Sequence, residues 1–212
     1  MKKTKILFIF VISIFIFMFT GCTEKTEPVI NDNVENINAE EVEEWDGRTK
    51  DAVISTAKLT FTGDIMVHSY QYNEAYDAQT DTYNFMHNFQ DMKKYFEKAD
   101  CVIGNIETTF GGTVSDYPMF STPDSFIDAL KDAGFDILTT ANNHCMDSGS
   151  DGLIRTLDKL DEYGISHMGT YRTKEESQNI LVQNINGINV AFLSYTYGTN
   201  GIPVPEDWLV NR

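Results

Sequence analysis

The feature that most constrains the fold is a repeated order of short apolar runs and amphipathic stretches. Three runs, "AKLTFTGD", "CVIGNIE" and "FDILTTA", have the length and composition of buried strands. Segments with apolar residues at helical spacing separate or follow them, at 86–99, 122–134 and 153–163. A chain in which strands alternate with helices favours an α/β layered domain.

Punctuation residues predict where these elements end. We expect the first strand, 57–62, to end in Gly63-Asp64 and the second strand to end at Gly104. In the helix at 122–134, Thr122 is placed to cap the first turn and Gly134 suits the position after the last turn.

The last third of the chain adds two further predicted elements. "ISHMG" reads as a brief strand, and Gly164 closes the helix that precedes it. "NILVQNINGINVAFLSYT" predicts a β-hairpin, because the dipeptide Asn186-Gly187 supplies the positive φ angles of a type I′ turn. The chain then ends in a stretch of loop character, so the sequence also predicts a domain that is incomplete on its C-terminal side.

Polar side chains follow each of the first three strands. Ligands bind beyond the carboxyl ends of the strands in open α/β sheets, so these side chains are expected to form one site. The structural alternatives are left-handed backbone geometry at Asn142-Asn143 and capping of the next helix by Asp147 or Ser148. The candidate site residues are Asp64 and His68 after the first strand, Asn105 and Glu107 after the second, and Asn142, Asn143, His144 and Asp147 after the third.

The residue types predict oxygen- and nitrogen-rich metal coordination. The set lacks a Cys-x-x-Cys pair, which favours Mn, Fe, Zn or Mg over a structural thiolate zinc site. A bridging carboxylate can hold two such ions, clamp a phosphoryl oxygen and lower the pKa of a bound water. A histidine that is not fully used as a ligand, such as His144, can protonate the leaving group.

Five stretches together resemble the CapA family of capsule-synthesis proteins, which are associated with poly-γ-glutamate: "LTFTGDIMVH", "ADCVIGNIETTFGG", "FDILTTANNHCMDSGSDGLIRTLDKL", "GISHMGTY" and "INVAFLSYT". The resemblance covers about 58–199 and implies a domain related to the calcineurin-like metallophosphoesterases. Such a domain is a four-layer α/β/β/α sandwich with a two-metal site at the strand ends.

The resemblance also implies roles for individual residues. Asp64 stands at the first metal-binding aspartate, Glu107 at the bridging carboxylate with Asn105 beside it, and Asn143 and His144 at a metal ligand and a catalytic histidine. Asp147 extends that motif. Two departures stand out: Asp64-Ile65-Met66 replaces Asp-x-His, which leaves His68 as a substitute ligand, and the later Gly-His-x-His motif is absent from this sequence.

The N-terminus predicts export. "MKKTKILFIFVISIFIFMFTGC" has a basic start and a 14-residue apolar run, short of the ~20 residues that a membrane-spanning helix needs. "FTGC" resembles a lipobox, so residues 1–21 are predicted to be a lipoprotein signal peptide, with lipidation at Cys22. The alternative is an uncleaved anchor. Residues 22–56 are acidic and predict a flexible tether, and 57–212 form the CapA-like domain.

Net charge limits the kinds of molecule that the protein can bind, and cysteine content limits its disulfide bonds. The chain carries 32 Asp and Glu against 16 Lys and Arg, a net charge of −16, which disfavours nucleic-acid binding. Export permits a disulfide between Cys101 and Cys145, but we expect both to remain free, with Cys101 in the core. Cys145 is either a packing residue or a soft metal ligand.

The sequence thus predicts a lipid-anchored protein on the extracytoplasmic face of the cell membrane. Its leading function is a part in making or exporting an anionic surface polymer, through a divalent-metal-dependent hydrolase or phosphoesterase-like site. One alternative is a non-catalytic accessory of a membrane polymer synthase that binds the polymer. The other is a generic metallophosphatase that acts on phosphoesters.

Overall fold

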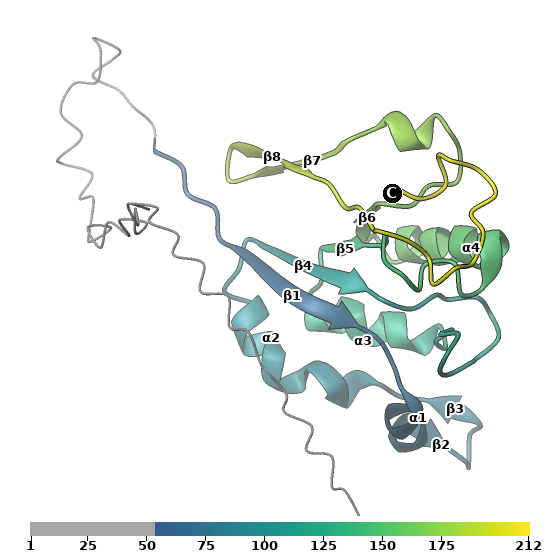
Figure 1. Ribbon diagram of the computed structural model, residues 1–212. Helices are drawn as coiled ribbons and strands as arrows, with labels where there is room; N and C mark the ends of the chain where they lie inside the picture. Colours follow the sequence, from purple (N-terminus) through teal and green to yellow (C-terminus); the bar gives the residue numbers. More distant parts are fainter. Residues whose placement is uncertain (1–53) are drawn as a thin grey trace, which may run out of the picture. The chain divides into compact units, whose positions relative to one another are not determined.

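A sheet of four parallel strands organises the computed structural model, which describes residues 54–212 (Figure 1). The strands lie side by side in the order in which they occur along the chain. They are β1 (Leu59–Ile65), β4 (Cys101–Ile106), β5 (Ile137–Thr139) and β6 (Ser166–Met168). The predicted α/β class is therefore confirmed.

Helices connect the strands. Parallel crossovers are right-handed, so a sheet whose strands keep their chain order collects all its connecting helices on one face. Two minimal strands, β2 (Tyr76–Asp77) and β3 (Thr82–Tyr83), pair within the first connection. The helices are α1 (Ser69–Ala75), the 3₁₀ turn η1 (Met86–Phe89), α2 (Gln90–Phe96), α3 (Ser125–Ala133) and α4 (Gly149–Glu162), and a second 3₁₀ turn, η2 (Glu176–Gln178), follows β6.

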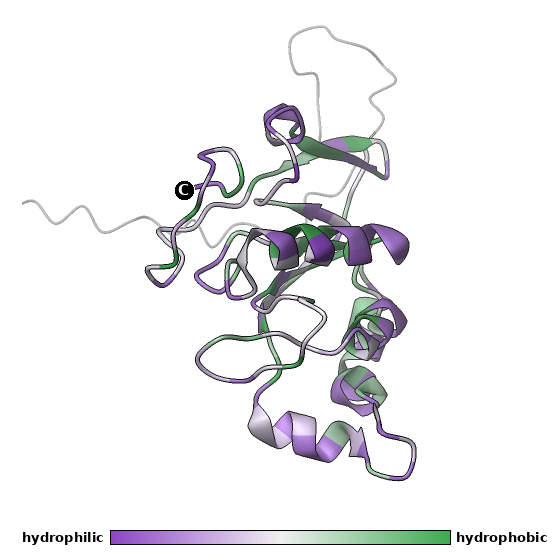
Figure 2. Ribbon diagram, turned by 90° about the vertical axis from the view of Figure 1, so that its right-hand side faces the viewer, coloured by the Kyte–Doolittle hydropathy of each residue, from purple (hydrophilic) through white to green (hydrophobic). Residues whose placement is uncertain are grey.

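Alternating side chains of the strands feed two separate apolar cores. Val102, Ile106 and Leu138 pack with the helices on one face of the sheet. Cys101, Ile103 and Ile137 pack on the other face against the hairpin β7 (Leu181–Ile185) and β8 (Ile188–Phe192). Figure 2 shows hydrophobic ribbon in the sheet and on the inner sides of the helices. Residues 54–212 thus form helix, sheet and hairpin layers, three of the four layers that the resemblance implies.

The hairpin confirms the turn prediction. Asn186 and Gly187 have φ angles of 52° and 85° between β7 and β8. Gly134 and Gly164, with φ angles of 99° and 62°, close α3 and α4 as predicted.

Some element boundaries differ from the predictions. β1 continues through Asp64 to Ile65 with an irregular register after Phe61, and β4 continues past Gly104 to Ile106. The predicted helix at 86–99 is divided into η1 and α2, and α2 ends at Phe96.

The predicted cap of α3 is wrong. Helix α3 begins only at Ser125 and its N-cap residue is Asp124, which makes no side-chain capping bond. The Thr122 hydroxyl lies 2.8 Å from the hydroxyl of Thr108 instead. A buried hydroxyl needs a hydrogen-bond partner, so the contact with Thr108 takes the place of a capping bond from Thr122.

Both described cysteines are free and buried, as expected. Burial raises the pKa of each thiol to about 11. Cys145 packs against Met146 and Leu153, which supports its interpretation as a packing residue. The predicted signal peptide, Cys22 and nearly all of the predicted tether lie outside the described residues.

No helix among residues 54–212 is long and apolar enough to cross a membrane.

Two glycines in neighbouring strands provide a matched test of the sheet packing. A Cβ added to Gly104 in β4 would lie 2.4 Å from Ile65 Cδ1 and 2.9 Å from Phe135 Cε1, whereas one added to Gly63 in β1 would meet nothing within 4 Å. We expect Gly104→Ala to lower the free energy of unfolding by about 1–3 kcal/mol through overpacking. Gly63→Ala should change it by less than about 0.5 kcal/mol. Urea titration measures both, and equal effects would contradict the described packing.

Candidate metal and catalytic site

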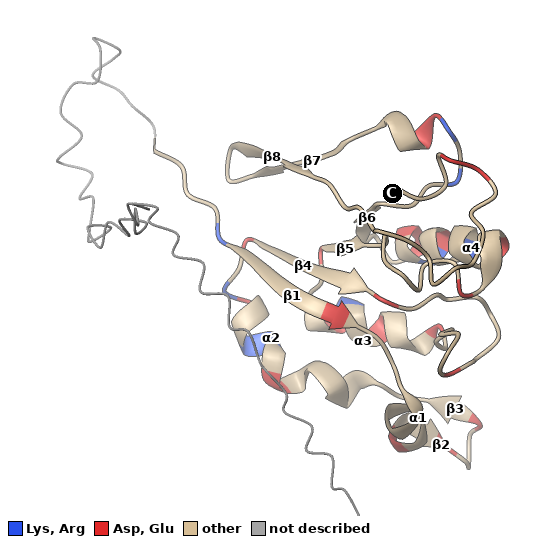
Figure 3. Cartoon of the chain, viewed as in Figure 1, with Lys and Arg blue, Asp and Glu red and all other residues tan. Residues whose placement is uncertain are grey.

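The candidate site lies at the carboxyl ends of β1, β4 and β5, where the chain order of the strands brings distant polar residues together. Asp64 of β1 is the register partner of Asn105 of β4. The Asn105 side-chain amide donates to Asp64 Oδ1 over 2.7 Å. Figure 3 shows acidic colour near the end of β1 and just beyond the end of β4. The continuation of both strands past their predicted ends is therefore what aligns these two side chains.

Asn105 is held in one orientation by its neighbours. Its Nδ2 faces a carboxylate, which can only accept, so Oδ1 must face the other way. That oxygen accepts from Thr139 Oγ1 at 2.9 Å and from Asn142 Nδ2 at 3.2 Å. Asn105 therefore links the ends of β1, β4 and β5. Its side-chain oxygen is occupied by hydrogen bonds from other residues of the protein.

Asn142 forms the turn after β5. Its side chain is buried, donates to the Ile106 carbonyl over 2.8 Å and accepts from the His144 backbone N–H over 3.0 Å. Neither Asn142 nor Asn143 is among the described non-glycine residues with positive φ angles, so the alternative of left-handed turn geometry is wrong. The contacts of Asn142 position His144 instead. Asn143, by contrast, is half-buried and uses only its Nδ2, which lies 3.4 Å from Asn200 Oδ1.

Glu107 follows β4 directly and lies beside the Asp64 carboxyl. Burial is the largest cause that raises the pKa of Glu107, followed by a side-chain hydrogen bond and charge repulsion with Asp64, while the nearby His144 acts in the opposite direction. Two carboxyl groups in contact repel unless a proton or a cation lies between them. The pair thus has the chemistry of a divalent-cation site.

His144 and Asp147 form a hydrogen-bonded pair next to these carboxylates. His144 Nδ1 lies 2.7 Å from Asp147 Oδ2, and the Asp147 side chain is only 1% exposed. Because an ionised carboxylate only accepts, Nδ1 carries the hydrogen and Nε2 remains available for a substrate or a metal. The predicted capping role of Asp147 is therefore not what its contacts show.

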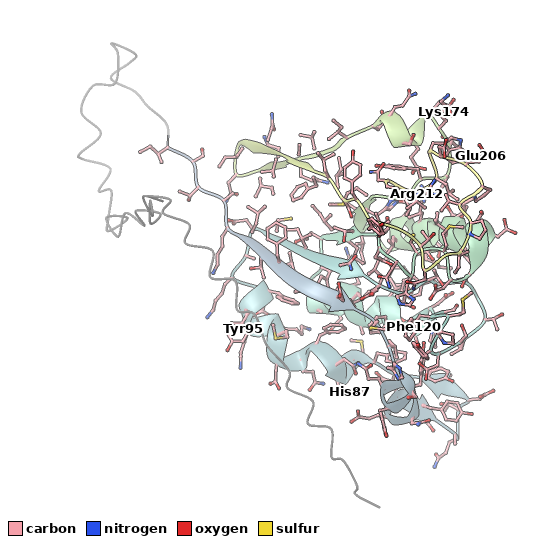
Figure 4. All side chains as sticks on the ribbon, viewed as in Figure 1. His87, Tyr95, Phe120, Lys174, Glu206 and Arg212 are labelled. Atoms are coloured by element: carbon pink, nitrogen blue, oxygen red, sulfur yellow. The ribbon has the colours of Figure 1, made fainter. Side chains whose placement is uncertain are left out.

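The loop between β4 and α3 supports this pair. The Phe120 backbone N–H donates to Asp147 Oδ2 over 2.6 Å, and the Phe120 ring lies edge-on to the His144 ring, with centroids 4.8 Å apart. Figure 4 labels Phe120 among the side chains near the ends of the strands. Asp147 Oδ1 is buried without a hydrogen-bond partner within residues 54–212, so this oxygen can still accept a hydrogen bond.

The described contacts of His68 do not include Asp64 or Glu107. It is the N-cap residue of α1, where its Nδ1 accepts from the Ser69 N–H over 2.9 Å. The same nitrogen lies 3.6 Å from Asp116 Oδ1, and its ring centroid lies 5.8 Å from that of Phe120. The described contacts therefore connect His68 to the loop that carries Phe120.

The donor set fits a divalent ion. Within the described residues, no three His, Cys, Asp or Glu side chains form a metal-binding group by themselves. Carboxylates of Asp64 and Glu107, with the free oxygen of Asn143, nevertheless give oxygen ligands that such ions accept. These three are the residues that would hold the metal, and Nε2 of His144 stays free for a substrate.

Three residues at the site were not predicted from the sequence. Thr139 and Phe120 position Asn105 and Asp147, and Asn200 Nδ2 lies 3.4 Å from both ring nitrogens of His144. The Asn200-Gly201 dipeptide, with φ angles of 52° and 80°, signals a turn in the sequence. Its position over the His144 ring depends on how the chain returns after β8, which no local pattern encodes.

Comparison with known proteins places the chain in a family. Residues 58–211 match the family model described as "Bacterial capsule synthesis protein PGA_cap". The capsule biosynthesis protein CapA of Bacillus anthracis is 29% identical over 147 residues, which cover 65% of this chain and 34% of that protein. The PGA biosynthesis protein CapA of Bacillus subtilis is 27% identical over 163 residues, which cover 72% of this chain and 42% of that protein.

A third relative, the uncharacterized protein y4sH of Sinorhizobium fredii, is 34% identical over 99 residues, which cover 42% of this chain and 21% of that protein. The chain thus spans less than half the length of these curated relatives. The family match extends over nearly all of the described residues, from the start of β1 to the buried segment at Val210. The chain therefore belongs to the bacterial capsule synthesis protein PGA_cap family.

Proposed function

We propose that this protein carries a divalent-metal-dependent, phosphoesterase-like hydrolase site that acts in the synthesis or export of an anionic surface polymer. The observation that supports it is the convergence of Asp64, Glu107 and the His144–Asp147 pair at one end of the sheet. Relatives whose names refer to capsule and PGA biosynthesis support the link to a surface polymer.

The geometry suggests how the protein's own residues divide the work. Asp64, Glu107 and Asn143 would hold the metal, and a bound divalent ion would stabilise negative charge and lower the pKa of a coordinated water. His144, with both ring nitrogens protonated, would donate its Nε2 proton to the leaving oxygen. Asp147 would keep Nδ1 protonated and stabilise the ring, as the 2.7 Å hydrogen bond between them suggests.

A chelator experiment tests this proposal. The full chain should retain up to two equivalents of Mn, Fe, Zn or Mg by mass spectrometry and should hydrolyse bis(p-nitrophenyl) phosphate. Removal of the metal should abolish turnover, and its return should restore it. Stoichiometric binding of the polymer with no turnover at any metal loading would instead favour the non-catalytic, polymer-binding accessory of a membrane synthase. Turnover of small phosphate esters without any polymer binding would favour a generic metallophosphatase.

The proposal includes a lipid anchor at Cys22 on the extracytoplasmic face of the cell membrane. We expect Cys22→Ser to move the protein from the membrane fraction to the soluble fraction, because a thiol at this position is required for acylation and the 14-residue apolar run is short for a span. Cell fractionation with immunoblotting measures the change. Thr23→Ser is the matched control and should leave the protein with the membranes. Equal retention of Cys22→Ser would exclude lipidation at this residue.

A further inference from the structure

An asparagine from the loop after β8 lies over the face of the His144 ring. Asn200 Nδ2 is 3.4 Å from both Nδ1 and Nε2 of His144. In the plane of the ring, an atom equally far from both nitrogens would collide either with Cε1 or with the bond between Cγ and Cδ2. The Asn200 amide therefore contacts the ring face, and the position in the ring plane beyond Nε2 stays free for a substrate.

The orientation of the Asn200 carboxamide follows from its other neighbour. Its Oδ1 accepts from Asn143 Nδ2 at 3.4 Å, which directs Nδ2 of Asn200 toward His144. A carboxamide nitrogen carries two hydrogens, and neither has an acceptor oxygen among the described residues. Asn200 is exposed, whereas the His144 side chain is only 12% exposed. Unused N–H donors thus lie beside the proton donor of the site, within reach of a ligand from solvent.

The loop that carries Asn200 is anchored at both ends. The Thr196 N–H donates to the Asn211 carbonyl over 3.0 Å, and the Asn211 N–H donates to the Gly169 carbonyl over 2.8 Å. Between these points, apolar side chains of the loop (yellow in Figure 1) pack in one cluster with Cys145, Met146 and residues of α4. They are Ile202, Val204, Trp208, Leu209 and Val210. The same apolar cluster therefore holds the Asn200 loop and the two residues that follow His144.

A second turn of the chain has the same backbone geometry but a different side-chain environment. Asn200-Gly201 has φ angles of 52° and 80°, and Asn186-Gly187 has φ angles of 52° and 85°. The Asn186 side chain donates to the Thr56 carbonyl over 3.1 Å. Glycine adopts positive φ angles without steric cost, so either asparagine can be replaced by glycine without strain in its turn. The two turns thus allow the effect of the Asn200 side chain to be separated from the effect of its backbone.

We propose that Asn200 is a further catalytic residue, whose Nδ2 donates a hydrogen bond to a non-bridging phosphoryl oxygen while His144 protonates the leaving oxygen. The proposal rests on the proposed function for the reaction itself. The two donor nitrogens lie 3.4 Å apart, close enough to reach two oxygens of one phosphorus atom. The carboxylates of Asp64 and Glu107 can only accept when they are ionised, so a neutral N–H donor stabilises charge that they cannot.

Two substitutions of Asn200 in the full chain test this role at saturating Mn²⁺. We expect Asn200→Gly to lower kcat/KM for bis(p-nitrophenyl) phosphate by about 10- to 10²-fold, less than a fully buried oxyanion donor would, and Asn200→Asp to lower it further. Aspartate keeps the shape of the side chain and tolerates a positive φ angle, but it lacks the N–H donors and adds a negative charge. Asn186→Gly is the matched control and should keep the wild-type value.

The aspartate variant also distinguishes a catalytic role from a positioning role. An aspartate oxygen can still accept from Asn143 Nδ2, so a residue that only positioned Asn143 would keep its function in Asn200→Asp. Wild-type kcat/KM in Asn200→Asp would therefore overturn the proposal. Amide spectra that superimpose on those of the wild type outside the substituted turn verify that each variant is folded.

Side-chain resonances provide a measurement that needs no turnover. In the Mg²⁺-loaded full chain with ¹⁵N-labelled asparagine, inorganic phosphate should shift the Nδ2 resonances of Asn200 and leave those of Asn186 unchanged. The absence of a shift at Asn200, with or without a shift at Asn143, would overturn the proposal. A shift at Asn200 in a chain that hydrolyses no phosphodiester would support the phosphate contact and contradict only the proposed hydrolysis. Turnover that is lost in His144→Ala but retained in Asn200→Asp would contradict only the role of Asn200.

Discussion

Replacement of His144 by alanine is expected to lower phosphodiester turnover by about 10²- to 10⁴-fold, the usual contribution of a general acid. The imidazole is held at Nδ1 by Asp147 and packed by the Phe120 ring, so the truncation removes a preorganised proton donor. Steady-state kinetics on bis(p-nitrophenyl) phosphate measures the loss, with bound metal quantified for the same preparation.

Asp147→Asn separates proton transfer from metal binding. An asparagine at this position can present an amide donor to Nδ1 and favour the wrong tautomer, while the carboxylates at Asp64 and Glu107 stay in place. Turnover should fall with metal content unchanged, and Asp147→Glu should recover part of the activity. Full activity in His144→Ala would contradict the assignment of His144 as the proton donor.

Glu107→Gln is expected to have opposite effects on stability with and without metal. In excess chelator the variant should be more stable than the wild type by about 1 kcal/mol, because the neutral amide no longer repels Asp64. In Mn²⁺ the order should reverse. A tenfold loss of metal affinity removes about 1.4 kcal/mol of ligand stabilisation at saturating metal, and loss of a direct ligand is expected to exceed that.

Thermal unfolding at fixed metal and chelator concentrations measures both arms of this comparison. Glu97→Gln serves as the control, because Glu97 lies at the end of α2 and should show the same stability change in both conditions. A Glu107→Gln variant that gains no stability in chelator, or that binds Mn²⁺ as tightly as the wild type, would show that Asp64 and Glu107 do not share an ion.

Local sequence patterns predicted the elements whose signals are short-range. The Asn186-Gly187 turn, the glycines after α3 and α4, and the buried strand at Cys101 all depend on neighbouring residues. The exact ends of β1 and β4 depend instead on pairing between the two strands. This pairing extends both strands beyond Gly63 and Gly104, where the sequence predicts that they end. The division of the segment 86–99 into η1 and α2 likewise reflects packing of Phe89 and Phe96 against Phe135 of the following connection.

The candidate site was predictable in position but not in detail. Strand ends in chain order place Asp64, Glu107 and His144 at one edge, which a topological rule anticipates. The hydrogen bond from Phe120 to Asp147 joins residues 27 positions apart through a loop without periodicity. Asn200 reaches His144 from a separation of 56 residues. Contacts of this kind arise only once the segments that carry them have packed against one another.

The unbroken strand order also bears on how the protein reaches its native state. Each strand of the main sheet pairs with the strand of that sheet that precedes it in the sequence. Its pairing partner is therefore synthesised before it. Asp64, Glu107, His144 and Asp147 can take their places as the polypeptide emerges N-terminus first, by the time Met168 has joined the sheet.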